Sequence, residues 1–155
     1  QADTLDEQAY DALASGDVEG ALEQLQHAVA TDPSNQDARF DYVKLLLQLG
    51  HVEEARLAFT PVQPQAASVR RLGALQDWLN ALDFVAASAL GADAGATFDA
   101  QIAANKRDFD ARFGRARWLM AQQRWTDAMD ELLEILMRDK AWNNEAARTT
   151  YISIL

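Results

Sequence analysis

Cysteine is absent from this chain, and proline and glycine are scarce. Without cysteine the chain has no disulfide, no thiolate metal site and no thiolate nucleophile, which fits a reducing compartment. Only three prolines and seven glycines interrupt 155 residues, so long continuous helices are possible. Leu and Ala dominate the apolar residues and β-branched residues are few, which favours helix over strand. The sequence therefore predicts an all-α fold.

Long hydrophobic runs and excess positive charge are also missing. No apolar run approaches the roughly 20 residues that a membrane span needs. The start of the chain, Gln1–Thr4, has neither the basic nor the apolar region of a signal peptide, and it lacks a Met, which leaves open a fragment or a processed chain. The formal net charge of −10 repels nucleic-acid phosphate and anionic lipid. We expect no nucleic-acid partner, no membrane partner and a cytoplasmic location.

The chain repeats itself with a period of about 34 residues, the length of a tetratricopeptide repeat, in which each unit is a pair of antiparallel helices. Gly16 and Gly50 begin similar heptapeptides one period apart, and the same spacing relates Ala21 to Ala55. The alanines allow close helix approach, and the glycines suit a turn that requires positive φ. One hairpin cannot bury its apolar faces alone, so neighbouring units must stack.

A third copy lies further along the chain. The segment Asp37–Phe40 recurs as Asp110–Phe113. The distance along the sequence between these two segments exceeds two repeat periods by about five residues. A degenerate unit with a short insertion therefore fits between the two copies. At the same offset Gln123 stands where the second copy has Gly50.

These spacings predict an all-α, tetratricopeptide-like solenoid of helical hairpins with an irregular middle unit. We expect a single domain over 1–155. Its units are predicted at about 2–35, 36–60, 66–107 (the degenerate unit) and 109–155. The predicted helices are 3–15, 18–31, 36–49, 52–60, 66–90, 96–105, 109–122, 125–138 and 144–155.

Three features mark the boundaries of these helices. Pro61 and Pro64 predict a break over residues 60–65. A second break is expected over residues 91–95, where the chain contains two glycines. Asn143 or Asn144 is expected to cap the N-terminus of the last helix, since Asn is a favoured N-cap residue.

Catalytic and metal-binding motifs are missing from the sequence. His27 and His51 fall in different units without metal-ligand spacing, and no phosphate loop, nucleophile elbow or zinc-protease motif occurs. The acidic pair Glu53–Glu54 is adjacent on a helix, and adjacent residues do not face each other. Arg112 and Asp110 are interpreted as helix-end charges, and the four tryptophans as packing residues. We therefore predict a protein that is not an enzyme and has no cofactor or metal.

A protein-binding groove is predicted along the first helices of the units, which line the binding face of such repeats. The inward positions are Asp3, Asp6, Tyr10 and Leu13, then Asp37, Phe40, Lys44 and Leu47, then Asp110, Phe113, Arg117 and Met120. The acids of the first unit exclude a clamp for a C-terminal carboxylate. The aromatic and apolar members suit an apolar partner segment instead. The alternative is that some of these residues belong to the core.

The last third of the chain is more specific than a generic repeat. Three segments, Asp110–Phe113, Ala128–Ile135 and Arg138–Arg148, resemble the C-terminal repeat region of bacterial thioredoxin-domain co-chaperones, the chaperedoxins. The resemblance implies a domain that holds unfolding clients and works with the chaperonin or the heat-shock chaperone system. The family's N-terminal thioredoxin domain and its Cys-x-x-Cys motif are absent here, so no redox activity is implied.

Two other functions are compatible with a generic repeat. A stand-alone tetratricopeptide scaffold for an envelope or secretion complex is the main alternative. A subunit that binds a small molecule is the third hypothesis, which no motif favours. The sequence does not specify the partner, the oligomeric state or regulation.

Overall fold

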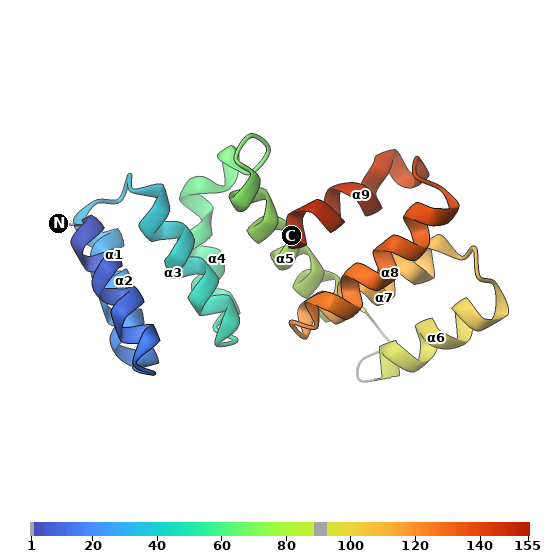
Figure 1. The fold of residues 1–155 in the computed structure, drawn as a ribbon, viewed down its shortest axis with the longest axis horizontal. Helices are drawn as coiled ribbons and strands as arrows, with labels where there is room; N and C mark the ends of the chain where they lie inside the picture. Colours follow the sequence, from blue (N-terminus) through green and yellow to red (C-terminus); the bar gives the residue numbers. More distant parts are fainter. Residues whose placement is uncertain (1, 89–92) are drawn as a thin grey trace. The chain divides into compact units, whose positions relative to one another are not determined.

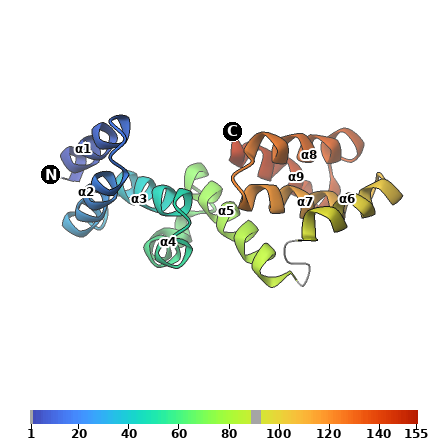
Figure 2. The same cartoon turned by 90° about the horizontal axis from the view of Figure 1, so that it is seen from below.

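The computed structural model describes residues 2–88 and 93–155, with side chains from Glu7 onward. Within these residues the chain is all-α, as predicted, with nine α-helices and one 3-10 helix (Figures 1 and 2). The elements are α1 (Ala2–Ala14), α2 (Val18–Thr31), α3 (Gln36–Gln48), α4 (Val52–Phe59), η1 (Thr60–Gln65), α5 (Arg70–Ala87), α6 (Ala94–Ala104), α7 (Phe109–Ala121), α8 (Trp125–Arg138) and α9 (Trp142–Ile154). None of these helices is both long enough and apolar enough to cross a membrane.

The chain divides into two compact units, Gln1–Leu75 and Gln76–Leu155, and α5 contributes to both. In unit 1, α1 packs on α2, α2 on α3 and α3 on α4, and η1 follows α4. In unit 2, α6 packs on α7, α7 on α8 and α8 on α9. Figure 1 shows the paired helices of each unit side by side. The pairwise hairpin packing confirms the predicted class, whereas the single domain over 1–155 stays a prediction.

Unit 1 follows the repeat period closely. Gly16 and Gly50 both adopt positive φ, at 85° and 81°, in the turns between paired helices. The alanines of the repeat, Ala21 and Ala55, are fully buried, so each pair of helices approaches closely at its alanine. Asn35 caps α3 by accepting a hydrogen bond from the backbone N–H of Ala38 at 3.1 Å.

Unit 2 packs around aromatic side chains, as expected for the tryptophans. Trp78 on α5 meets Trp125 on α8 edge to face, with ring centroids 4.8 Å apart. Trp142 packs edge to face on Phe113, with centroids 5.4 Å apart. The third copy of the repeat alanine, Ala128, is also fully buried.

The proline-rich break is helical rather than open. Residues Thr60–Gln65 form η1, with Pro61 near its start and Pro64 inside it. Pro61 lies in the first turn, where no intrahelical N–H donor is needed, and i→i+3 bonds such as Ala66 N–H to Gln63 C=O at 3.0 Å close the end of the segment. The α-helix therefore begins at Arg70, and the predicted start at residue 66 is wrong.

The last helix also begins differently from the prediction. Asn143 and Asn144 do not cap it, because both adopt left-handed backbone angles, with φ 49° and 54°, in a kink that follows Trp142. Glu145 continues this left-handed turn at φ 63°. Asn tolerates this region better than most residues because its short polar side chain bonds locally. The predicted break at 91–95 lies partly outside the described residues.

Candidate functional site

A groove in unit 1 lies between α1 and α3 and has a volume of about 180 Å³. Its lining residues are Ala9, Tyr10, Leu13, Leu25, Asp41, Lys44, Leu45 and Gln48. Leu25 is buried beneath it, whereas Tyr10 and Leu13 are 56% and 38% exposed. The Tyr10 hydroxyl donates to Asp41 Oδ2 at 2.8 Å, which ties α1 to α3 across the groove. We call this site the α1–α3 groove.

Three other predicted groove residues of unit 1, Asp37, Phe40 and Leu47, do not line the α1–α3 groove. Phe40 is partly buried, with Lys44 Nζ 5.9 Å and Arg71 Cζ 5.1 Å from its ring centroid, both within cation–π range. Arg71 also forms an ion pair with Asp37. Leu47 is only 2% exposed and does not line the α1–α3 groove, which fits the alternative that some of these positions belong to the core. A position counted from helical spacing alone does not specify how deeply the neighbouring helix covers it.

A larger cavity of about 340 Å³ lies in unit 2. Its lining residues come from α5, α7 and α9: Asp77, Asn80, Phe113, Arg117, Met120, Asn143, Asn144, Ala146, Thr149 and Thr150. The guanidinium carbon of Arg117 lies 4.9 Å from the Phe113 ring centroid and 5.2 Å from that of Phe84. Two rings thus hold this cation in place beside the cavity. We call this site the α5–α9 cavity.

Two oppositely charged groups in the α5–α9 cavity are partly desolvated. Burial raises the pKa of the Asp77 carboxyl, against the opposing effects of a hydrogen bond from Ser153 and of the positive charge of Arg117. The Ser153 hydroxyl donates this bond at 2.6 Å. Burial likewise lowers the pKa of Arg117, and the charge of Asp77 opposes that shift. The cavity therefore offers a hydrogen-bond acceptor and a guanidinium donor, together with neutral amides and hydroxyls.

The two sites share a pattern set by the repeat. Phe40 and Phe113 occupy equivalent positions of two copies, as do Lys44 and Arg117, and in each unit the cation lies over the ring one turn before it. The structure thus places Tyr10, Leu13 and Lys44 at the α1–α3 groove, and Phe113, Arg117 and Met120 at the α5–α9 cavity, whereas Phe40 contacts Lys44 without lining the groove. Their role in binding stays a prediction.

Some predicted positions do not line either site. The side chains of Asp3 and Asp6 lie outside the described residues, and Asp110 is exposed on α7 away from the cavity lining. Sequence reasoning missed Asp77 and Thr150, because neither α5 nor α9 matches the first helix of a regular unit. The sequence feature that could have pointed to the α9 residues is their position within or just after the chaperedoxin-like segment Arg138–Arg148.

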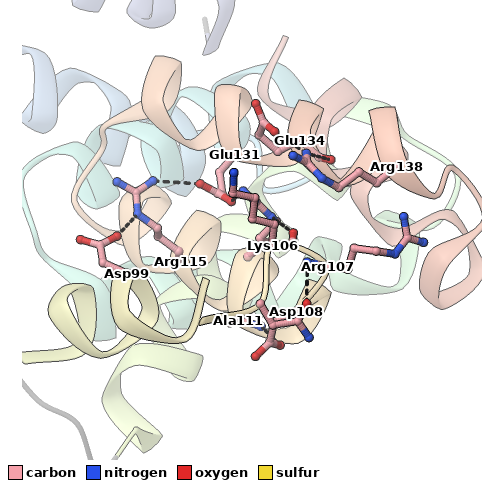
Figure 3. A network of polar contacts seen from close by, with 11 residues as sticks. Asp99, Lys106, Arg107, Asp108, Ala111, Arg115, Glu131, Glu134 and Arg138 are labelled. Atoms are coloured by element: carbon pink, nitrogen blue, oxygen red, sulfur yellow. Dashed lines mark hydrogen bonds and ion pairs between the residues drawn. The ribbon is translucent and has the colours of Figure 1, made fainter. Parts of the chain in front are cut away.

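A polar network joins α6, α7 and α8 on another part of unit 2 (Figure 3). Arg112 is 6% exposed and donates to Glu131 Oε1 at 2.7 Å and to the Lys106 carbonyl at 2.7 Å. Arg115 bridges Glu131 at 3.1 Å and Asp99 at 2.8 Å, as Figure 3 shows. The interpretation of Arg112 as a helix-end charge is therefore wrong, because its partner is a buried carboxylate on the neighbouring helix.

No catalytic constellation emerges from the described part of the chain. His27 and His51 are both exposed, and His51 Nδ1 lies 3.5 Å from Glu54 Oε1. Within residues 2–88 and 93–155, no group of three potential ligands among His, Asp and Glu is placed to hold a metal ion.

Two family models, each described as a tetratricopeptide repeat, match the chain at residues 12–79 and 89–155. These two regions are therefore tetratricopeptide-repeat regions, a kind of domain that typically binds other proteins and is not catalytic. A comparison with curated proteins gave no match. The matches identify the repeat and carry no information on a co-chaperone role.

Proposed function

We propose that this chain is the protein-binding repeat domain of a thioredoxin-like co-chaperone, holding clients or docking to chaperones. The observation that carries the proposal is the same in both units. The first helix of a hairpin carries an aromatic ring and, one turn later, a cation that lines an open groove or cavity. Aromatic residues and arginine, here Phe113 and Arg117 of unit 2, are among the side chains that most often dominate protein interfaces.

The chemistry of the two sites suits polypeptide segments. Tyr10 and Leu13 give the α1–α3 groove an apolar wall that can cover a partner's side chain. Asp77 and Arg117 give the α5–α9 cavity an acceptor and a donor that match the N–H and C=O groups of a peptide backbone. The co-chaperone context rests on the resemblance of Arg138–Arg148 to chaperedoxins.

The direct test is protection of a client from aggregation. Light scattering of heat-denatured citrate synthase would be followed with and without an equimolar amount of this chain. We expect the wild type to suppress scattering and the double variant Tyr10→Ala, Arg117→Ala to lose most of that effect. Leu57→Ala is the matched control, because Leu57 is an apolar residue of α4 that is 76% exposed and lines neither site.

The outcomes separate the parts of the proposal. Equal protection by the double variant and the wild type would contradict the assignment of binding to these two sites. No protection by the wild type, together with no co-sedimentation with purified bacterial chaperonin, would contradict the co-chaperone role. That result would favour a dedicated scaffold instead. Neither outcome changes the assignment of the tetratricopeptide repeats.

A further inference from the structure

The α1–α3 groove has an exposed apolar wall on α1. Tyr10 and Leu13 are three residues apart and so lie on neighbouring positions of one helix face. Their exposed fractions, 56% and 38%, are high for large apolar side chains. The groove extends inward to Leu25 and Leu45, which are 2% and 5% exposed. It is therefore shaped to receive an apolar side chain of a partner.

The formal charge of the first hairpin and of the turn after it is of one sign. Residues 1–38 contain no Lys or Arg, although the whole chain has 14. The same residues carry nine acids: Asp3, Asp6, Glu7, Asp11, Asp17, Glu19, Glu23, Asp32 and Asp37. The first cation of the sequence, Arg39, is 7% exposed and donates inward, to the Ala58 and Pro33 carbonyls. The Arg39 guanidinium therefore does not offset the exposed acids of the first hairpin.

Two of these acids, Glu7 and Asp11, are exposed on α1, the helix that carries the apolar wall. Glu7 lies three residues before Tyr10, at a neighbouring position of the helix face, and Asp11 lies one turn after Glu7. On the opposite wall, Asp41 accepts the Tyr10 hydroxyl and Lys44 is the one cation among the lining residues. Lys44 lies over the Phe40 ring, with 5.9 Å from Nζ to the centroid. The groove therefore has an apolar floor, and the exposed charges that α1 carries beside it, Glu7 and Asp11, are acidic.

We propose that the α1–α3 groove docks a Lys- and Arg-rich amphipathic segment of a partner protein. This inference rests on the proposed protein-binding function and specifies the partner's chemistry. An apolar side chain of the segment packs between Tyr10 and Leu13, and its cations lie against Glu7 and Asp11. Complementary charge accelerates association and discriminates against acidic segments. A second copy of this chain is a poor occupant, because each copy carries a formal net charge of −10.

The test measures peptide binding by fluorescence anisotropy. The probes are a labelled 12-residue amphipathic peptide with Lys and Arg on its polar face and a matched peptide with Glu at those positions. We expect the basic peptide to bind at least about tenfold more tightly than the acidic one. Its affinity should fall at least about fivefold between 0.05 and 0.5 M NaCl, because salt screens exposed charges.

Variants of the full chain separate this site from net charge. Glu7→Lys with Asp11→Lys should weaken binding of the basic peptide at least about tenfold, and Leu13→Ser should weaken it with little change in salt dependence. The control is Glu53→Lys with Glu54→Lys, which makes the same charge change at exposed acids of α4 in the same unit. The control should bind within about threefold of wild type, and circular dichroism should show equal helicity in all variants.

Several results would overturn the inference. An equal loss in the two charge-reversed variants would mean that only net charge attracts the peptide. Equal binding of the acidic and basic peptides would contradict the role of charge in partner selection. If sedimentation equilibrium shows a dimer and Leu13→Ser dissociates it, the occupant of the groove is a second copy of this chain. If neither peptide binds but Tyr10→Ala still reduces client protection, then the proposed function holds and the basic partner is wrong.

Discussion

Arg39 and Arg112 occupy equivalent positions in two copies of the repeat, and both are buried in the unit to which they belong. Arg39 donates to the Pro33 carbonyl at 3.2 Å and to the Ala58 carbonyl at 2.9 Å. It thereby joins the turn before α3 to α4. Arg112 makes the same two links in its own unit, with acceptors on Lys106 and Glu131, the residues equivalent to Pro33 and Ala58. The repeat thus preserves a buried guanidinium together with its two anchoring points.

Around Arg112, the acceptor on the following helix is the Glu131 carboxylate rather than a backbone carbonyl. Arg112→Ala would leave that carboxylate buried with only Arg115, at 3.1 Å, as an ion-pair partner. We expect the free energy of unfolding to fall by about 3 kcal/mol, because breaking a buried pair strands a charge. All four tryptophans lie in unit 2, so their fluorescence during urea unfolding reports this change.

The control for Arg112→Ala is Arg124→Ala. Arg124 pairs with Asp127 at 2.7 Å, and both side chains are about half exposed. An exposed pair of this kind contributes at most about 1 kcal/mol. Losses of similar size in the two variants would contradict the buried, structural role of Arg112.

The turn before α4 depends on the backbone freedom of glycine. Gly50 has φ 81°, and no heavy atom lies within 4 Å of a Cβ built there, so the cost of a side chain is conformational only. Gly50→Ala should lower the free energy of unfolding by about 1–2 kcal/mol, measured by circular dichroism in urea. Gly50→Asn should cost less than Gly50→Ala, because Asn visits the left-handed region more readily. Equal costs would contradict this explanation.

The contact between α3 and α4 is set by a small residue. Ala55 is fully buried, and we expect Ala55→Leu to destabilise the protein by about 1–3 kcal/mol through overpacking. Ala30→Leu makes the same change at an exposed position of α2 and should shift stability by no more than about 0.5 kcal/mol. The melting temperature by circular dichroism measures both. An unchanged melting temperature for Ala55→Leu would mean that the helices are not in close contact there.

The raised pKa of Asp77 predicts that the difference in stability between the wild type and Asp77→Asn depends on pH. Its pKa is raised in the folded chain, so the folded chain holds the carboxyl proton more tightly than the unfolded chain. The free energy of unfolding therefore falls as pH rises from the unfolded pKa through the folded pKa. Asp77→Asn does not titrate there, so its stability relative to wild type should increase between pH 4 and pH 7. Tryptophan fluorescence in urea at the two pH values measures the difference.

The control for Asp77→Asn is Asp130→Asn, which removes an exposed carboxylate in the same unit. It corrects for the general effect of one fewer negative charge. An increase with pH that is as large for Asp130→Asn as for Asp77→Asn would contradict a special role for the buried carboxyl.

Local sequence rules predicted most helices of this fold. Ala21, Ala55 and Ala128 are all buried, because a repeat must use its small residues at close helix contacts. The repeat offset also placed Gln123 at the position of Gly50, and Gln123 adopts φ 60° although it is not glycine. The rules failed at the start of α9, where Asn143 and Asn144 form a left-handed kink instead of an N-cap.

The candidate site was partly predictable for the same reason. Phe113 and Arg117 line the α5–α9 cavity because α7 is a regular first helix, and their spacing on it is fixed. Asp77 could not be anticipated, since its helix belongs to the degenerate part of the repeat. Likewise, the burial of Arg112 depends on Glu131 on the next helix, a pairing that no local rule specifies.

The central claim, that the α1–α3 groove and the α5–α9 cavity bind polypeptide, is tested most directly by NMR. Backbone amide shifts of the labelled chain would be recorded while a reduced, unfolded client protein is added. We expect the largest changes around Tyr10 and Lys44 in unit 1 and around Arg117 and Thr149 in unit 2. Changes confined to Leu57 and Met137, which are exposed and line neither site, would contradict the claim.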